Sequence, residues 1–173
     1  MLLKLETERL LLRPFEKSDA QAMYDNWASD EEVTKYLTWN AHTNIEETKF
    51  ILKLWIEEYQ KPERINLGIV LKDTNELIGG IDVVGYIEGV PVIGYCISRK
   101  HWNKGIMSEA LKELTNYLFS IGHTKIRVDA MVDNIGSNKV IQKCGGVYIN
   151  TYDDFIKAKQ RTNKINSYLI YKK

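Results

Sequence analysis

Cysteine is scarce in this chain, and the two that are present are too few and too far apart to organise a fold. Cys96 and Cys144 have neither the paired spacing of a zinc site nor the density of a disulfide-stapled secreted domain. Their apolar surroundings in the sequence predict two buried thiols, which suits the reducing cytoplasm. The three histidines, His42, His101 and His123, are dispersed and show no metal-ligand spacing, so no metal is expected.

An excess of charge of one sign is also missing. Twenty-four Lys and Arg residues balance 23 Asp and Glu residues, which leaves a net charge of +1. Without an overall positive field, neither nucleic acid nor an anionic membrane is expected as a partner. We interpret the basic run Lys157–Arg161 as a solvated loop, with an acidic substrate beside it as the open alternative.

Long apolar runs, repeats and low-complexity stretches are absent. Glu6 and Glu8 interrupt the opening apolar stretch, so no signal peptide is expected, and no later run approaches the length of a membrane span. Three prolines and 11 glycines are spread thinly, and 44% of the residues are hydrophobic. These features predict a cytoplasmic protein that folds as a single domain over residues 1–173.

The first third of the chain predicts one strand followed by two helices. The leucine-rich segment Glu8–Phe15 is typical of a strand. A capping-box spacing that starts at Ser18 predicts an amphipathic helix over Ser18–Ala28, and the same spacing at Thr43 predicts a second helix that ends by Pro62.

In the rest of the chain the spacing of the apolar residues changes twice. Short alternating runs between turn residues predict an antiparallel meander of three strands, Asn66–Leu71, Glu76–Tyr86 and Val92–Ser98. An amphipathic helix and then an alternating strand predict a parallel crossover, at Lys104–Ser120 and Lys125–Val132. A short helix and two strands complete the chain, at Ser137–Cys144, Gly146–Tyr152 and Ser167–Tyr171. The fold class is therefore α/β with a mixed sheet, antiparallel first and parallel where the crossover enters.

The junction between the third meander strand and the long helix carries the clearest chemical signal. Lys104 and Gly105 stand directly before the helix, where unpaired backbone N–H groups and the helix dipole favour an anion such as pyrophosphate. Gly105 lacks a Cβ and lets a phosphate approach the backbone, and the Ser108 hydroxyl lies in the first turn. An ordinary turn and cap is the alternative. Neither a Walker loop nor a G-x-G-x-x-G fingerprint occurs in the sequence.

Three segments in order resemble one known family. The stretch W-N-K-G-I-M-S-E-A-L resembles the acyl-CoA pyrophosphate loop of GNAT acetyltransferases, Q/R-x-x-G-x-G/A. Asn134, Ser137, Lys143 and Gly145 match a second family pattern, N-x-x-S-x-x-x-x-x-K-x-G, and the opening E-T-E-R-L-L-L-R-P-F resembles the first strand. Within the family, the sequence most specifically resembles the branch that acetylates ribosomal-protein N-termini. It implies a GNAT-like, mostly antiparallel sheet with helices on both faces and acetyl-CoA at the crossover.

The chain departs from the family pattern at five positions. Trp102 replaces Gln or Arg, as is usual in this branch, and Asn103 replaces a glycine. Met107 replaces Gly or Ala, so its extra volume either crowds the phosphate or points inward. Ile141 stands where many members carry a tyrosine that protonates the departing thiolate, and Gly146 replaces a common phenylalanine. These departures leave the identity of the general acid open.

The resemblance implies direct attack of a neutral amine on the thioester in a ternary complex. It assigns Ser137 and Asn134 to catalysis, with a helix cap as the alternative for each, and places the oxyanion donor among the backbone N–H groups of Cys96 to Ser98. The coenzyme-binding set that it implies is Cys96, Ile97, Ser98, Trp102, Asn103, Lys104, Gly105, Ile106, Met107, Ser108, Asn134 and Lys143.

The acceptor is the least determined part of the interpretation. Asp82 and Asp129 are candidate bases, with structural carboxylates as the alternative. Aromatic side chains suit an amine pocket, although core packing is the better explanation of any one of them. The substrate-binding set is Trp27, Asp82, Tyr86, Tyr95 and Asp129. A protein or peptide α-amine is the leading acceptor. A polyamine, amino acid or aminoglycoside, and a non-catalytic acyl-CoA sensor, are the alternatives. Similar proteins often form homodimers, which leaves the oligomeric state open.

Overall fold

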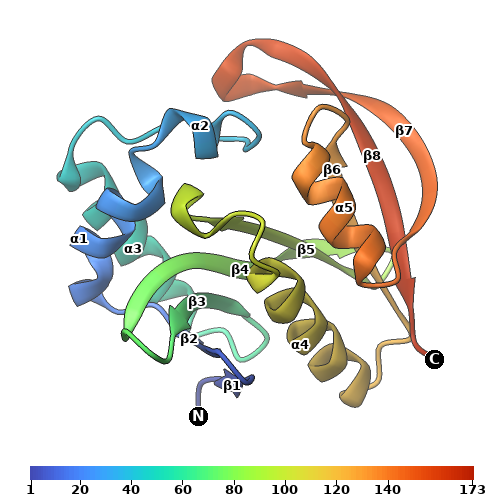
Figure 1. Cartoon of the computed structure of the whole chain (residues 1–173), viewed down its shortest axis with the longest axis horizontal. Helices are drawn as coiled ribbons and strands as arrows, with labels where there is room; N and C mark the ends of the chain where they lie inside the picture. The colour runs from blue at the N-terminus through green and yellow to red at the C-terminus, as the bar shows by residue number, and fades with distance from the viewer.

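The computed structural model describes all 173 residues and contains one eight-stranded sheet of order β1-β2-β3-β4-β5-β6-β8-β7 (Figure 1). All neighbouring strands are antiparallel except β5 and β6, which are parallel. The mixed, mostly antiparallel α/β fold is therefore confirmed. The strands are β1 (Leu5–Glu6), β2 (Leu10–Pro14), β3 (Asn66–Leu71), β4 (Glu76–Ile87), β5 (Val90–Ile97), β6 (Lys125–Met131), β7 (Val147–Ile156) and β8 (Arg161–Tyr171).

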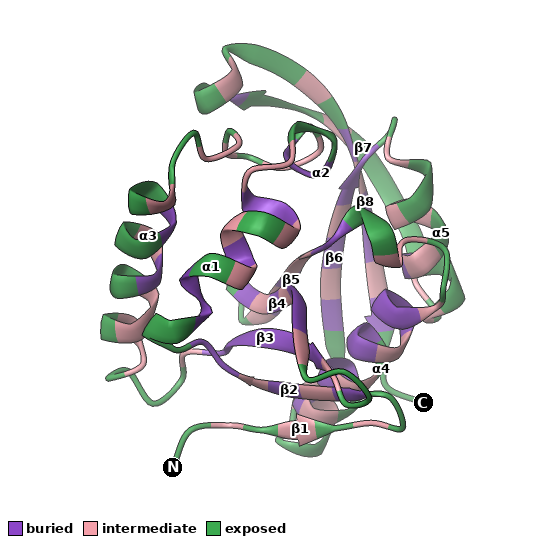
Figure 2. Ribbon diagram, turned by 60° about the vertical axis from the view of Figure 1, so that its left-hand side comes forward, coloured by how far each residue is buried: buried purple, intermediate pink, exposed green.

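Helices cover both faces of the sheet (Figures 1 and 2). One group consists of α1 (Ala20–Met23), a π-helical turn (Tyr24–Ala28), α2 (Glu31–Thr34) and α3 (Ile45–Glu58). The other group consists of α4 (Ile106–Ser120) and α5 (Ile135–Lys143). No helix combines the length and the apolar character that a membrane span requires.

Two hydrophobic cores lie on the two faces. The first contains 22 buried residues, including the stripe of α4 at helical spacing, Ile106, Ala110, Leu111, Leu114 and Leu118. The second contains nine buried residues beneath the N-terminal helices, with Trp27 and Leu52 among them. Because α4 buries one complete stripe, its direction relative to the sheet is fixed, and with it the position of the loop that precedes it.

The N-terminal caps differ from the sequence prediction. The capping pair of the first helical segment is Glu16 with Asp19 rather than Ser18 with Gln21. The Asp19 carboxylate accepts hydrogen bonds from the Glu16 N–H at 2.7 Å and from Arg13 at 2.9 Å. A carboxylate that also pairs with an arginine outcompetes a serine hydroxyl for the cap.

The second predicted cap is displaced by one residue. Asn44, not Thr43, caps α3, because its side-chain oxygen accepts from the Glu47 N–H at 3.2 Å. Both cysteines are free thiols, and both are half-buried rather than buried as predicted.

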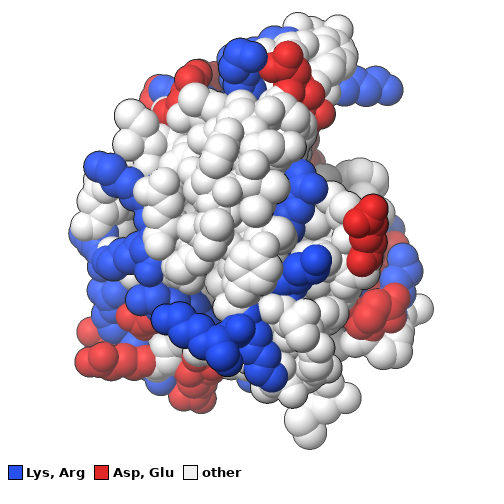
Figure 3. Space-filling model, turned by 90° about the vertical axis from the view of Figure 1, so that its right-hand side faces the viewer, with Lys and Arg blue, Asp and Glu red and all other residues white.

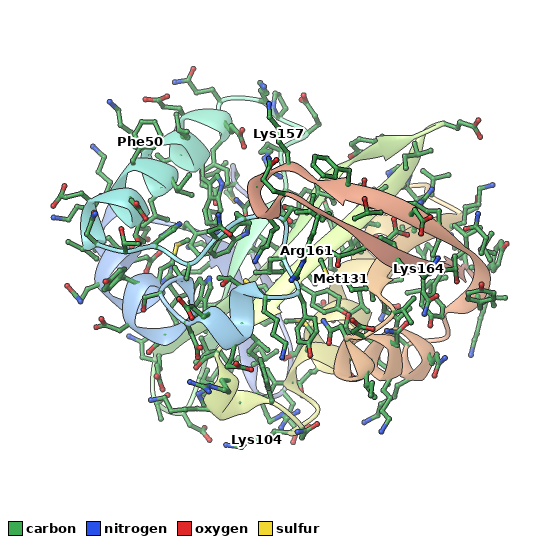
Figure 4. All side chains as sticks on the ribbon, turned by 90° about the horizontal axis from the view of Figure 1, so that it is seen from above. Phe50, Lys104, Met131, Lys157, Arg161 and Lys164 are labelled. Carbon is green, nitrogen blue, oxygen red and sulfur yellow. The ribbon has the colours of Figure 1, made fainter.

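The final hairpin is much longer than predicted and arches over the sheet towards α2 (Figure 1). Its tip is the turn Lys157–Lys159, so the expected basic loop belongs to a structured element. Lys157 and Arg161 lie at this tip, seen from above in Figure 4. The Lys159 ammonium donates to the Thr34 carbonyl at 2.7 Å, Arg161 donates to the Lys35 carbonyl at 3.1 Å, and Asn40 donates to the Ala158 carbonyl at 3.0 Å. The hairpin tip is thus fastened to the N-terminal half.

Candidate active site

The segment that joins β5 to α4 leaves backbone N–H groups unpaired where the helix begins. Asn103 and Gly105 adopt left-handed conformations, with φ of 60° and 74°. No side chain caps α4, so the first N–H groups of the helix keep their hydrogen-bonding capacity and the positive end of its dipole. We call residues Trp102–Ser108 the anion loop, because this arrangement favours a bound anion such as pyrophosphate.

Apolar side chains of the anion loop point into the protein. Ile106 and Met107 are buried in the first core, Met107 with only 6% of its surface exposed. The Met107 side chain therefore points into the core and does not crowd an anion bound at the loop. Ser108 is buried as well, whereas Asn103 and Lys104 are exposed.

The two parallel strands diverge beside the anion loop. β5 and β6 pair only at Val92 with Arg127 and at Ile93 with Val128, so the rest of β5 has no strand on that side. The Ser98 N–H donates to the Ile78 carbonyl of β4 at 2.7 Å, and by alternation the N–H of Cys96 also faces β4. Among the three N–H groups expected to be available as oxyanion donors, that of Ile97 is the one that faces the gap. We call this space the β5–β6 gap.

Trp102 supports this orientation of β5. Its indole N–H donates to the Ile97 carbonyl at 3.0 Å, so the backbone groups of Ile97 lie outside the β4–β5 ladder. The indole also packs against both hydrophobic cores. Trp102 therefore fixes the end of β5 relative to the anion loop.

The start of α5 brings two predicted residues together. Asn134 is the N-cap of α5 and accepts from the Ser137 N–H at 3.2 Å, which leaves the Ser137 hydroxyl free of any capping role. That hydroxyl lies 2.7 Å from the Tyr95 hydroxyl of β5. Burial raises the pKa of Tyr95, so the phenol keeps its proton at neutral pH. Tyr95 is thus placed against Ser137 at the start of α5.

The two candidate bases are both held by arginines. Asp82 pairs with Arg64 at 3.1 Å, and Arg64 also pairs with Glu58 at 2.7 Å. Burial raises the pKa of Asp82 although Arg64 opposes the shift. The Arg64 guanidinium thus holds this carboxylate in place by an ion pair.

Asp129 is held in the same way. Arg127 donates to it at 3.0 Å, and the Tyr152 hydroxyl donates at 2.7 Å. Burial, followed by the Asp129 carboxylate, raises the pKa of Tyr152 to about 12, so this phenol stays a donor. Neither carboxylate is therefore free of partners.

The remaining predicted residues lie elsewhere in the fold, apart from the pair Ser137 and Tyr95. Trp27 is 1% exposed in the second core. Tyr86 is 47% exposed and lies near the β4–β5 turn, its ring 6.2 Å from that of His123, at the opposite end of β5 from the anion loop. Lys143 is exposed on the last turn of α5. Ile141 is completely buried, so its position contributes to the core.

Asn138 is a site residue that sequence reasoning missed. Its amide donates to the carbonyls of Met131 and Asn134 at 2.9 and 2.8 Å. Its side-chain oxygen accepts from Asn166 at 3.0 Å and from the Tyr168 hydroxyl at 2.7 Å. Asn138 thereby locks the start of α5 to β6 and β8. Its position directly after Ser137 was the only available signal.

Comparison with known proteins agrees with this geometry. Residues 9–147 match the family described as Acetyltransferase (GNAT) domain. The chain is 30% identical over 172 residues to the N-acetyltransferase p20 of Bacillus licheniformis, covering 98% of this chain and 96% of p20. It is 34% identical to the N-acetyltransferase YoaA of Bacillus subtilis over 82% of this chain and 81% of that protein.

Solved structures share the fold at lower identity. A Salmonella typhimurium acetyltransferase that modifies the N-terminal serine of ribosomal protein L7/L12 has a TM-score of 0.82 at 19% identity, over 99% of this chain and all of the other. The microcin C7 self-immunity acetyltransferase MccE, in complex with acetyl-CoA and AMP, has a TM-score of 0.85 at 18% identity, over 96% and 94% of the two chains.

The chain belongs to the GNAT acetyltransferase family. It is an acetyl-CoA-dependent N-acetyltransferase, and its acceptor is an amine. The uncapped start of α4, the glycine in a left-handed conformation before it and the inward-pointing Met107 fit the pyrophosphate of acetyl-CoA.

Proposed function

We propose that this enzyme acetylates the α-amine of a protein or peptide, by direct attack of the amine on acetyl-CoA in a ternary complex. The observation that carries this proposal is the pairing of Asp82 with Arg64 and of Asp129 with Arg127. Because arginines hold both carboxylates, we assign neither of them as the base, and an acceptor that is partly neutral by itself suits such a site. An α-amine, with a pKa of about 7.7–8.0, meets this condition near pH 7, whereas a lysine at about 10.4 does not.

The residues of the site then have separate roles. In our proposal the anion loop and Lys143 hold the coenzyme, with Asn134 orienting its amide, and the backbone N–H of Ile97 stabilises the developing oxyanion in the β5–β6 gap. The amine forms the new C–N bond and loses one proton, while the C–S bond breaks and the sulfur gains one. Ser137 donates a hydrogen bond to the departing sulfur, and Tyr95 holds the Ser137 hydroxyl. Positioning of the two substrates contributes about 7–11 kcal/mol.

The hairpin tip also favours a chain end as the acceptor. The hairpin is fastened to Thr34 and Lys35, and its residues Ile156 and Ile165 pack against Met131 of β6 (Figure 4). An amine at the end of an extended chain can enter beneath the hairpin. A lysine within a folded protein surface is flanked by polypeptide on both sides, which the hairpin would obstruct.

Two alternatives are less well supported. A polyamine or aminoglycoside acceptor calls for unpaired acidic side chains, whereas Asp82 and Asp129 are both paired with arginines. A non-catalytic acyl-CoA sensor would need no hydroxyl at the start of α5, yet Ser137 is 2.7 Å from Tyr95 and free of capping duty.

Release of free thiol from acetyl-CoA tests the acceptor class. Peptides with a free N-terminus, the same peptides with a blocked N-terminus and an internal lysine, and spermidine are compared as acceptors. We expect turnover only with the free α-amine, and kcat/KM that rises with pH and levels off near the pKa of the acceptor, about 7.7–8.0. Turnover with spermidine alone would overturn the proposal, and acetyl-CoA binding without turnover on any amine would favour the sensor.

A further inference from the structure

Arg9, from the segment just before β2, reaches the anion loop from its carbonyl side. Its guanidinium donates to the Lys104 carbonyl at 3.0 Å and to the Glu109 carboxylate at 2.8 Å. A Cβ added to Gly105 would lie 3.6 Å from the remaining Arg9 nitrogen, so this nitrogen is also beside the loop. One side chain therefore contacts a loop that is about a hundred residues away in sequence.

Glu109 explains why such a contact is needed. It lies in the first turn of α4, and a carboxylate in this turn suits the helix dipole but repels a phosphate bound at the same end. Thr7 donates to this carboxylate at 2.5 Å, as do the backbone and side chain of Arg9 at 3.0 and 2.8 Å. Burial alone raises the pKa of Glu109, but these bonds from Thr7 and Arg9 outweigh it and leave the pKa lowered. Glu109 is thus ionised, and Arg9 is its compensating charge.

We propose that Arg9 is a positioning residue for coenzyme binding, which holds the anion loop open for the pyrophosphate and neutralises Glu109. Hydrogen bonding to the Lys104 carbonyl polarises the peptide that follows and strengthens the Gly105 N–H as a donor to phosphate. The inference rests on the proposed placement of the pyrophosphate at the anion loop. This role gives a function to the opening E-T-E-R-L segment, which from its sequence alone is only the start of a strand.

The test separates the pyrophosphate half of the coenzyme from its acyl half. Dissociation constants are measured calorimetrically for acetyl-CoA and for S-acetylpantetheine, which ends before the pyrophosphate. We expect Arg9→Ala to weaken acetyl-CoA binding about tenfold, the equivalent of about 1.4 kcal/mol, and to change S-acetylpantetheine binding less than twofold. We expect Arg9→Ala with Glu109→Ala to bind acetyl-CoA more tightly than Arg9→Ala alone, because the uncompensated carboxylate is then absent.

The matched control is Lys72→Ala. Lys72 donates to the Thr7 carbonyl at 2.6 Å and pairs with Glu6 at 3.1 Å, so it braces the same N-terminal segment without touching the loop. Equal weakening of both ligands by Arg9→Ala, or the same loss in Lys72→Ala, would assign Arg9 to general stability and overturn the inference. Arg9→Lys, which keeps the charge, serves if the alanine variant does not fold.

Other results would contradict the placement of the coenzyme at the anion loop itself. Wild-type protein that does not bind acetyl-CoA, or a Gly105→Arg variant that binds it normally, would remove the anion loop from the coenzyme site. Normal binding by the wild type, loss in Gly105→Arg and no loss in Arg9→Ala would overturn the role of Arg9 alone.

Discussion

At the scale of single residues, the hydroxyl pair of Ser137 and Tyr95 makes the sharpest prediction. We expect Ser137→Ala to lower kcat about 10²-fold, because the departing sulfur loses its donor, and Tyr95→Phe to lower it about tenfold. The double variant should be no slower than Ser137→Ala, since Tyr95 acts through Ser137. Steady-state thiol release gives kcat, and calorimetry should give an acetyl-CoA Kd within twofold of the wild type. Additive losses, or an unchanged rate in Ser137→Ala, would contradict this arrangement.

The sequence allowed part of this site to be predicted. Asn134 and Ser137 could be identified through the resemblance of their segment to a family pattern. The partner of Ser137 could not be, because strand alternation gives two faces without saying which one meets a helix that is 42 positions away. The same limit applies to Asp82 and Asp129, whose arginine partners depend on the packing of the sheet.

At the scale of elements, the hairpin tip should control the acceptor and not the coenzyme. We expect Lys159→Ala combined with Arg161→Ala to raise the KM for a peptide acceptor severalfold, because the tip loses two of its bonds to residues 34 and 35. The acetyl-CoA Kd should stay unchanged. Lys164→Ala is the control, since its partner Asp153 lies within the hairpin itself (Figure 4). An unchanged acceptor KM, or an equal change in the control, would argue against a role in acceptor binding.

The length of the final hairpin could not be predicted from the sequence, in contrast to the length of α4. α4 was predicted closely because it buries a complete apolar stripe. β7 gave no such signal, since all but two of its ten residues are exposed and their polarity does not alternate. Figure 3, which faces the side that carries α5 and β7, shows a broad uncharged surface there. Backbone pairing with β8, not a buried face, holds β7 in place.

At the scale of the whole molecule, the question is whether the two cores unfold together, as the prediction of a single domain over residues 1–173 requires. The sheet separates them, but Trp102 packs against both. All four tryptophans contact the second core and Trp102 alone also contacts the first, so intrinsic fluorescence reports mainly on the second core, whereas far-UV circular dichroism reports on the entire chain.

Leu111 provides the test, because it is completely buried in the first core, whereas three of the four tryptophans contact the second core alone. Leu111→Ala should destabilise the protein by about 2–5 kcal/mol through the cavity it leaves. If the chain is one cooperative unit, the fluorescence and circular dichroism midpoints in urea fall together by the same amount. Leu52→Ala, in the second core, should shift both probes in the same way. If the fluorescence midpoint of Leu111→Ala stays at the wild-type value, the two sides of the sheet unfold separately. The anion loop could then unfold locally while the N-terminal helices over the second core stay folded.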